Sequence, residues 1–398
     1  MVQLCGRPVL EHTLRSLAAA GVTEAIVVQS PKPRLGDWPY LTPEEYFGDG
    51  RQLGLGLSYV TQEEATGQGD AMLLAATHLP DRFFVVQPEN INAGEIATEL
   101  VKAHDPACAG VVATQEKEET WLFGVFALKG GRVVDIVEKP VAGEEPSKLV
   151  NMWVALLDQS YLTALRSQPS HPHSSVFALK KLANERGLVA VVTKNPFFPL
   201  KFPWHLLAMR DYLFERQTGA VSPKAVVDSG ARIEGNVVIE AGSQVAASAI
   251  IKGPAYIGPN VVIDEFVILR PGCVIEAEVT LRPYTDLFNT LVGRGTRIHR
   301  SYLANSILGE GIWTDANLAA TNTNLHGGEV TVDVKGHTIS TQLEKLGAVV
   351  GRGSRFGVNV TLLPGVMVGA GNTVAAGSVI ERNLPDQPGQ PGQPSVAS

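Results

Sequence analysis

The sequence predicts a protein with an N-terminal α/β domain and a C-terminal parallel β-helix. Strand and helix patterns alternate in the first half, and aliphatic residues recur at every sixth position in the second half. The length of 398 residues also favours two domains, because a single hydrophobic core seldom grows to that size. We place the domains at residues 1–203 and 221–384, with a helical linker over residues 204–220.

The six-residue period is the strongest signal. Aliphatic side chains stand at Val227, Ile233, Ile239, Val245, Ile251, Ile257, Ile263, Leu269, Ile275, Leu281 and Leu287, and the period returns at Val350, Phe356, Leu362, Val368, Val374 and Ile380. Neither the 3.6-residue period of a helix nor the two-residue period of a strand explains it. A coil that turns a corner every six residues does, because each aliphatic side chain then points to the axis of a prism.

Two stretches break the β-helix pattern. Residues 318–345 lose the period, and we interpret them as a loop or arm inserted in the β-helix. Residues 385–398 are rich in proline, glycine and glutamine, a composition typical of a disordered tail.

The first half alternates between helix and strand signals. Helices are expected over 8–20, 69–79 and 95–104, with strands at 25–30, 57–62, 82–87 and 111–114. Residues 123–139 favour a hairpin that turns at Gly130 and Gly131. Alternation on this scale predicts a doubly wound α/β sheet.

The amino-acid composition argues against several classes of partner. The net charge of −7 argues against a nucleic-acid or anionic-membrane partner. The three cysteines, Cys5, Cys108 and Cys273, fit neither a disulfide framework nor a metal motif, which favours a reducing compartment. No apolar run approaches the ~20 residues of a membrane span. We therefore expect a cytoplasmic protein without nucleic-acid or membrane partners.

Three segments of the first half, GRPVLEHTL, QEEATGQGDAM and VEKP, resemble the sugar-1-phosphate nucleotidyltransferase family, whose domain has a Rossmann-like fold. The resemblance covers residues 1–215 and implies a sugar-phosphate and UTP site. In it, Gln62 would pair with a pyrimidine edge, and Gly67 would let the base approach closely. Gly124, Glu138 and Asn151 would line the sugar pocket.

Three departures from this family lower the expectation of nucleotidyl transfer. The family's glycine-rich phosphate loop and its central first strand would precede Val2, where this sequence has no counterpart. The family's metal-binding Gly-Asp pair is replaced by Pro88-Glu89, so Glu89 is the remaining Mg²⁺ candidate. The second metal carboxylate would fall near FFPLKF at residues 197–202, which contains none.

The second half resembles hexapeptide-repeat acyltransferases, which have left-handed β-helices and assemble as trimers. The segment HRSYLANSILG matches their H-x-x-Y motif. Histidine is suited to remove a proton from an attacking amine near neutral pH, so His299 is the candidate base for transfer from acetyl-CoA. Tyr302 and Asn322 would complete the catalytic set. Arg270 would bind the sugar phosphate through two hydrogen bonds, and Lys345 would lie near the substrates.

The whole chain therefore resembles the bifunctional GlmU-type family, which couples N-acetylation of glucosamine-1-phosphate to uridylyl transfer. One phosphate-binding lysine of that family is replaced here by Phe288. Two alternatives remain. One is a sugar-1-phosphate nucleotidyltransferase whose β-helix only assembles the oligomer, which Pro88-Glu89 and FFPLKF disfavour. The other is a non-catalytic regulatory subunit that senses sugar nucleotides, which the set of His299, Tyr302 and Asn322 disfavours.

Overall fold

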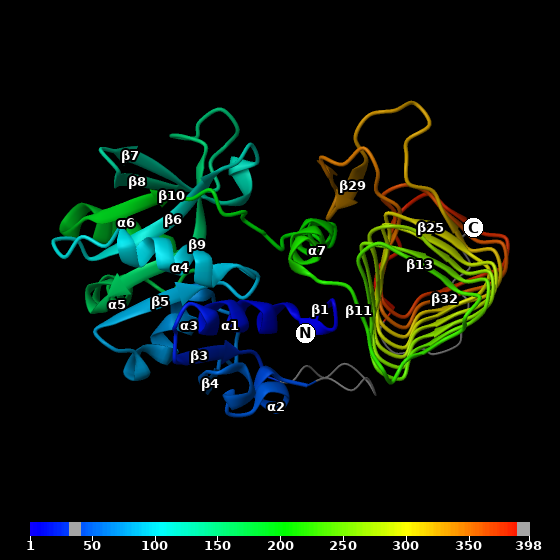
Figure 1. Ribbon diagram of the computed structural model, residues 1–398. Helices are drawn as coiled ribbons and strands as arrows, with labels where there is room; N and C mark the ends of the chain where they lie inside the picture. Colours follow the sequence, from blue (N-terminus) through cyan, green and yellow to red (C-terminus); the bar gives the residue numbers. More distant parts are fainter. Residues whose placement is uncertain (32–40, 388–398) are drawn as a thin grey trace. The chain divides into compact units, whose positions relative to one another are not determined.

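The computed structural model describes residues 1–31 and 41–387. The chain forms two compact units (Figure 1). The first contains Met1 and Pro8–Pro199, and the second contains Val2–Arg7 together with the chain from Leu200 onward. Residues 388–398 of the predicted tail lie outside the described residues. Within the described ranges, no helix has the length and apolar character needed to cross a membrane.

The first unit is built on a six-stranded mixed sheet. Its strand order is β5 (Arg82–Val86), β9 (Leu149–Asp158), β6 (Gly110–Glu116), β10 (Leu188–Val192), β8 (Arg132–Glu138) and β7 (Gly124–Lys129). Strands β6 and β10 are parallel, and β9 runs antiparallel to β5 and β6. The predicted hairpin is confirmed as β7 and β8, with Gly130 and Gly131 at positive φ in the turn.

Apolar clusters on two faces of this sheet confirm the doubly wound architecture. On one face, side chains of α5 (Gln159–Arg166) and α6 (Ser174–Arg186) pack with Phe126 and Leu157. On the other, α4 (Ala93–Lys102) packs with Val111 and Val154. The remaining helices are α1 (Val9–Ala19), α2 (Pro43–Phe47), α3 (Gln68–Ala75) and the 3₁₀ turns η1 (Arg51–Leu53), η2 (Ala76–His78) and η3 (Thr120–Leu122).

A second, two-stranded parallel sheet stands apart from the first. It consists of β3 (Glu24–Gln29) and β4 (Gly56–Thr61). Among the described residues no strand joins β3 to the six-stranded sheet. Helices α1 and α4 pack closely beside this division. A Cβ added to Gly94 would lie 1.9 Å from the Ser16 carbonyl oxygen, so only glycine allows the observed approach.

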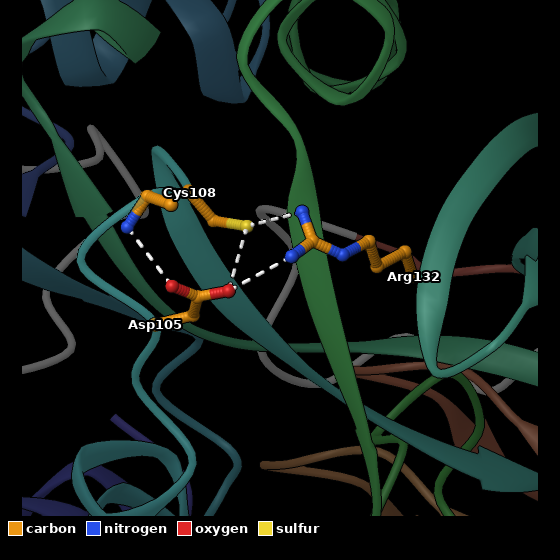
Figure 2. A network of polar contacts seen from close by, with 4 residues as sticks. Asp105, Cys108 and Arg132 are labelled. Carbon is orange, nitrogen blue, oxygen red and sulfur yellow. Dashed lines mark hydrogen bonds and ion pairs between the residues drawn. The ribbon is translucent and has the colours of Figure 1, made fainter.

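A polar network fixes the loop before β6 to the hairpin (Figure 2). The Arg132 guanidinium donates to the Asp105 carboxylate at 2.9 Å and to the Cys108 sulfur at 2.9 Å. Burial raises the pKa of the Cys108 thiol, and the charge of Arg132 opposes this rise. The network is therefore structural, since a protonated thiol is a poor nucleophile.

The second unit is a left-handed parallel β-helix whose three faces are eight-stranded parallel sheets (Figure 1). Face 1 contains β11 (Ala220–Val221), β14 (Val237–Ile239), β17 (Ala255–Ile257), β20 (Cys273–Ile275), β23 (Leu291–Val292), β26 (Ile307–Leu308), β31 (Val349–Val350) and β34 (Met367–Val368). Face 2 contains β12 (Val226–Val227), β15 (Gln244–Val245), β18 (Val262–Ile263), β21 (Thr280–Leu281), β24 (Arg297–Ile298), β27 (Trp313–Thr314), β32 (Arg355–Phe356) and β35 (Thr373–Val374). Face 3 contains β13 (Arg232–Glu234), β16 (Ile250–Lys252), β19 (Ile268–Leu269), β22 (Asp286–Phe288), β25 (Tyr302–Ala304), β28 (Ala319–Ala320), β33 (Thr361–Leu362) and β36 (Val379–Ile380).

From Ile239 onward the predicted aliphatic residues form one buried column along the axis of the prism, and Val227 and Ile233 pack against it partly buried. The β-helix does not stop where the six-residue period ends after Leu287. It continues with shorter sides, whose inward residues are Val292, Ile298, Leu303 and Leu308. Buried hydroxyls occupy the corners of these shorter coils. The Thr290 hydroxyl, for example, donates to the Phe288 carbonyl at 2.9 Å, which satisfies a backbone group that a tight corner exposes.

The predicted insertion begins later than the sequence indicated. Ala319 and Ala320 still belong to the prism, because β28 pairs with β25 and β33. The arm that follows is not wholly irregular. It contains an antiparallel hairpin, β29 (Thr331–Val334) and β30 (His337–Ser340), which projects from the coils in Figure 1. Residues 385–387, assigned from sequence to the tail, are ordered by contact with the last coils. The Gln387 amide donates to the Ala370 carbonyl at 2.8 Å.

Face 1 carries a short hairpin from the start of the chain, β1 (Gln3–Leu4) and β2 (Arg7–Pro8). Its turn residue Gly6 donates its amide to the Glu276 carboxylate at 3.0 Å. Gly6 has φ +78°, and an added Cβ would lie 2.0 Å from the Tyr256 hydroxyl oxygen. Burial raises the pKa of the Glu276 carboxyl to about 7, against the lowering effect of the Gly6 and Cys5 amides. The linker helix α7 (His205–Arg216) also belongs to this unit.

This raised pKa predicts a pH-dependent stability. The folded protein keeps a proton on Glu276 up to about pH 7, whereas the unfolded chain releases it near the ordinary value of 4.5. The folded state therefore binds more protons in this window, and stability falls as pH rises from about 4.5 to about 7. Relative to Glu276→Gln, the wild type should lose on the order of 3 kcal/mol of unfolding free energy across the window, at 1.36 kcal/mol per pKa unit.

The measurement is urea denaturation of both proteins at a series of pH values. Glu240→Gln is the matched control, because Glu240 occupies the equivalent position in an earlier coil of the prism. Parallel pH profiles for the wild type and Glu276→Gln would contradict the prediction.

Candidate functional site

In the first unit, two of the sequence-predicted residues lie at the end of β4 and the start of α3. The Gln62 side-chain amide donates to the Gly67 carbonyl at 3.1 Å. Gly67 has φ +130°, and an added Cβ would lie 3.0 Å from the Pro172 Cα. Glycine is therefore required both by the backbone conformation and by the packing of the neighbouring turn. A surface hollow beside Gln62 is lined by the carboxylates of Glu63, Glu64 and Asp70, among other residues.

The three residues predicted to line a sugar pocket lie together on β7, β8 and β9. Gly124 and Glu138 are register partners, and a Cβ on Gly124 would lie 2.9 Å from Glu138 Oε2 and 3.9 Å from the Asn151 Cβ. Asn151 accepts a hydrogen bond from the Trp153 amide at 2.9 Å. Its Nδ2 is buried with no hydrogen-bond partner among the described residues. A buried donor without a partner is costly, so this nitrogen is suited to an incoming ligand acceptor.

Sequence reasoning missed His173 at this site. Its Nδ1 lies 3.5 Å from Glu138 Oε1, and the residues from His171 to Ser175 form the turn that begins α6. A Cβ on Gly69 would lie 2.2 Å from Ser174 Oγ, so this turn packs directly on the first turn of α3. The turn thereby connects the Gln62 and Gly67 segment to the Glu138 group. The only sequence signal is the presence of two histidines, His171 and His173, in a segment rich in serine and proline.

Few side chains that could bind a metal ion lie at the predicted metal position. Glu89 follows β5 and is half-buried. The described residues contain no group of three or more histidine, cysteine or carboxylate side chains placed to hold a metal ion. The segment expected to hold a second carboxylate instead buries Phe197 and Phe198, and Phe197 packs against Phe123 with ring centroids 5.5 Å apart. The residues present do not fit a Mg²⁺ site held by two protein carboxylates.

In the second unit, Arg270 and Tyr302 share face 3 with Asp286. Asp286 and Tyr302 are register partners on β22 and β25. Arg270 Nε donates to Asp286 Oδ1 at 2.9 Å, and its Nη2 donates to the other carboxylate oxygen. The guanidinium is therefore held by a carboxylate through two hydrogen bonds. The Tyr302 side chain is exposed beside this pair.

The candidate base His299 lies at the corner between faces 2 and 3, directly after β24. Its backbone amide donates to the Thr314 hydroxyl at 3.1 Å, and its carbonyl accepts from the Ser301 hydroxyl at 2.7 Å. These two bonds fix the corner. The imidazole lies 5.9 Å from the Trp313 ring, and Nε2 has no hydrogen-bond partner among the described residues although it is shielded from solvent.

Asn322 and Lys345 lie at a different corner, where the arm leaves and rejoins the prism. The Asn322 side chain donates to Asn305 Oδ1 at 2.7 Å, and its carbonyl accepts from the Leu346 amide beside Lys345. The strands of face 3 separate this corner from His299. Within one chain, Asn322 therefore lies near Lys345, and Tyr302 lies near Arg270. Asn322 and His299 do not lie together.

Comparison with known proteins finds similar proteins for the first unit and for the chain as a whole. A family model described as nucleotidyl transferase matches residues 1–195. A bifunctional protein GlmU from Methanococcus maripaludis strain C7 is 31% identical over 389 residues, covering 96% of this chain and 90% of the relative. The chain belongs to the GlmU-type family.

Other GlmU-type relatives are similar over the same length. A bifunctional sugar-1-phosphate nucleotidylyltransferase/acetyltransferase from Sulfurisphaera tokodaii is 26% identical, covering 96% of this chain and 92% of the relative. A bifunctional protein GlmU from Methanocaldococcus jannaschii is 25% identical, with coverages of 96% and 90%. These relatives confirm the resemblance inferred from the motifs, and they extend through both units.

Proposed function

We propose that this protein is a transferase of sugar-nucleotide biosynthesis whose β-helix N-acetylates glucosamine-1-phosphate with acetyl-CoA. The observation that carries the proposal is His299 Nε2, a shielded imidazole nitrogen without a partner among the described residues. The name of the Sulfurisphaera tokodaii relative, a bifunctional sugar-1-phosphate nucleotidylyltransferase/acetyltransferase, supports the same chemistry. Two hydrogen bonds to the backbone of His299 hold the corner that carries it, which supports a role for its imidazole as a general base.

The proposed reaction balances with the groups that the two substrates bring. The amine nitrogen of the sugar attacks the thioester carbonyl carbon, and an N–C bond forms. The C–S bond then breaks, and coenzyme A leaves with the electron pair on sulfur. His299 takes the proton that the amine loses, and this proton can then pass to the leaving thiolate. Tyr302, exposed on face 3, is the candidate hydrogen-bond donor to substrate oxygen.

Assembly with a second copy would complete the site. Asn322 and Lys345 occupy a corner remote from His299 within one chain, so their proposed part in the same reaction requires the corner of a neighbouring prism. Exposed apolar side chains on the prism, including Val226 and Val379, favour such packing. We propose a homotrimer on this basis.

The first unit is proposed to bind a sugar nucleotide and to transfer the uridylyl group poorly. Its sugar-pocket residues lie together and include the unpartnered Asn151 nitrogen. In phosphoryl-type transfer Mg²⁺ neutralises the charge of the phosphates. Here the carboxylate expected near residue 197 is absent, and buried phenylalanines take its place. The carboxylates of Glu63, Glu64 and Asp70 beside Gln62 would also repel a triphosphate.

Replacing His299 tests the acetyl-transfer proposal. His299→Ala should lower kcat for acetyl transfer to glucosamine-1-phosphate by about 10²-fold or more, because general-base catalysis contributes ~10²–10⁴-fold. Tyr302→Phe should cost less, since it removes one hydrogen bond. Release of the coenzyme A thiol measures the rate, and circular dichroism checks that the β-helix remains folded. Equal rates for wild type and His299→Ala would place the base elsewhere.

The uridylyl-transfer proposal predicts a weak activity. With UTP, Mg²⁺ and N-acetylglucosamine-1-phosphate, pyrophosphate release should stay far below the ~1–10³ s⁻¹ typical of enzymes. A coupled pyrophosphate assay measures it. Turnover within that range would contradict the proposal.

The oligomer proposal predicts a trimer in solution at micromolar concentration. Light scattering coupled to gel filtration should give about three times the chain mass of 42.5 kDa. A single species at the monomer mass would refute both the trimer and the shared site.

A further inference from the structure

The outer side of face 2 carries an indole between two guanidinium groups. Trp313 on β27 is the register partner of Arg297 on β24 and of Arg355 on β32. Neighbouring strands lie ≈ 4.8 Å apart, so the three side chains form one continuous row. The Arg297 guanidinium carbon lies 5.1 Å from the Trp313 ring centroid, within the range of a cation–π contact. All three side chains are exposed, Trp313 by 40%.

These two arginines differ from those of the earlier coils. Four arginines there are paired with carboxylates, as Arg232–Glu234, Arg270–Asp286, Arg282–Asp264 and Arg294–Glu278. Arg297 and Arg355 have no ion pair within residues 1–31 and 41–387. Their partners along face 2 on the outer coils are the uncharged Thr280 and Thr373. The row therefore presents two positive charges that no carboxylate of the described residues neutralises.

The row also borders the candidate base. The imidazole of His299 lies 5.9 Å from the Trp313 ring, so a ligand on the indole would lie next to His299. The arginine that sequence comparison assigned to phosphate binding is differently placed. Arg270 already shares two hydrogen bonds with Asp286, so the carboxylate offsets its charge and only its remaining N–H donors are open to a phosphate. Guanidinium groups form their strongest contacts with phosphates as planar, two-pronged donors, and Arg297 and Arg355 remain available for this role.

We propose that Arg297, Trp313 and Arg355 bind the phosphate group of a substrate of acetyl transfer, with the indole stacking on the body of that substrate. This inference rests on the proposed acetyl-transfer function and names the residues that would hold its substrate. Two sources offer the same chemistry, the phosphate of the amino sugar and the phosphates of the acyl donor. Both carry a flat or apolar face that an indole can cover.

Steady-state kinetics of the full-length protein test the assignment. Arg297→Gln and Arg355→Gln should each raise KM about tenfold or more, as expected for loss of a charge-assisted hydrogen bond, with little change in kcat. Arg294→Gln is the matched control, because it removes the same charge from an arginine paired with Glu278. A rise in KM for glucosamine-1-phosphate alone assigns the row to the acceptor, and a rise for acetyl-CoA alone assigns it to the donor. Unchanged KM for both substrates would overturn the proposal.

A binding measurement separates this inference from the proposed function. The full-length protein is titrated with glucose-1-phosphate and with adenosine 3′,5′-bisphosphate, while tryptophan fluorescence is recorded at physiological ionic strength. Quenching should require the phosphate, so glucose and adenosine should have no effect, and Trp313→Phe should abolish the change. If the protein binds the phosphorylated ligand but does not acetylate, the inference stands and the acetyl-transfer function fails. If it acetylates but neither phosphorylated ligand changes the Trp313 signal, the inference fails and the function stands.

Discussion

The buried aliphatic column of the β-helix is the constraint on which the placement of the acetyl-transfer residues depends. Each inward side chain contributes ~1.5–3 kcal/mol when fully buried, and the stacked coils repeat this burial along the whole prism. Because alternate residues of a short strand point to opposite sides, an inward Ile298 dictates that Arg297 faces outward. Parallel register then places each outward side chain beside its counterpart in the next coil. The alignment of outward side chains in rows is thus a consequence of how the inward side chains pack.

The same aliphatic column continues through the shorter coils near His299. Between Leu287 and Leu308 some sides lose one residue, yet the inward positions remain apolar and fully stacked. The tighter corners expose backbone groups, and buried hydroxyls such as Thr290 and Ser306 satisfy them. His299 and Tyr302 both lie in this shortened region. Its hydroxyl-fixed corners hold their backbones in place more firmly than an unbonded turn would.

Charge is distributed unevenly over the prism. Most arginines of the early coils are neutralised by carboxylates on the same or the neighbouring coil, and such exposed pairs contribute little to stability. Arg297 and Arg355 flank an indole instead. In the first unit the carboxylates beside Gln62 create the opposite situation, a negative surface where a nucleoside triphosphate would be expected. The two units therefore differ in their electrostatic suitability for phosphorylated ligands.

The sequence by itself determined the architecture, because its two signals are local and periodic. The aliphatic residues at every sixth position from Val227 to Leu287 required a coil with six-residue sides. The alternating strand and helix patterns before residue 203 required helices on both faces of a sheet. It also identified Gly124, Glu138 and Asn151 as a group, through motifs. Only the tertiary structure decided which side chains are already engaged. Arg270 is bound by Asp286, His173 approaches Glu138, and Trp313 lies between two arginines from different coils. These contacts join residues that are remote in sequence, and they depend on register, which shifts where coils shorten and where the arm is inserted. A fixed six-residue period does not encode either change, so the sequence alone could not reveal them.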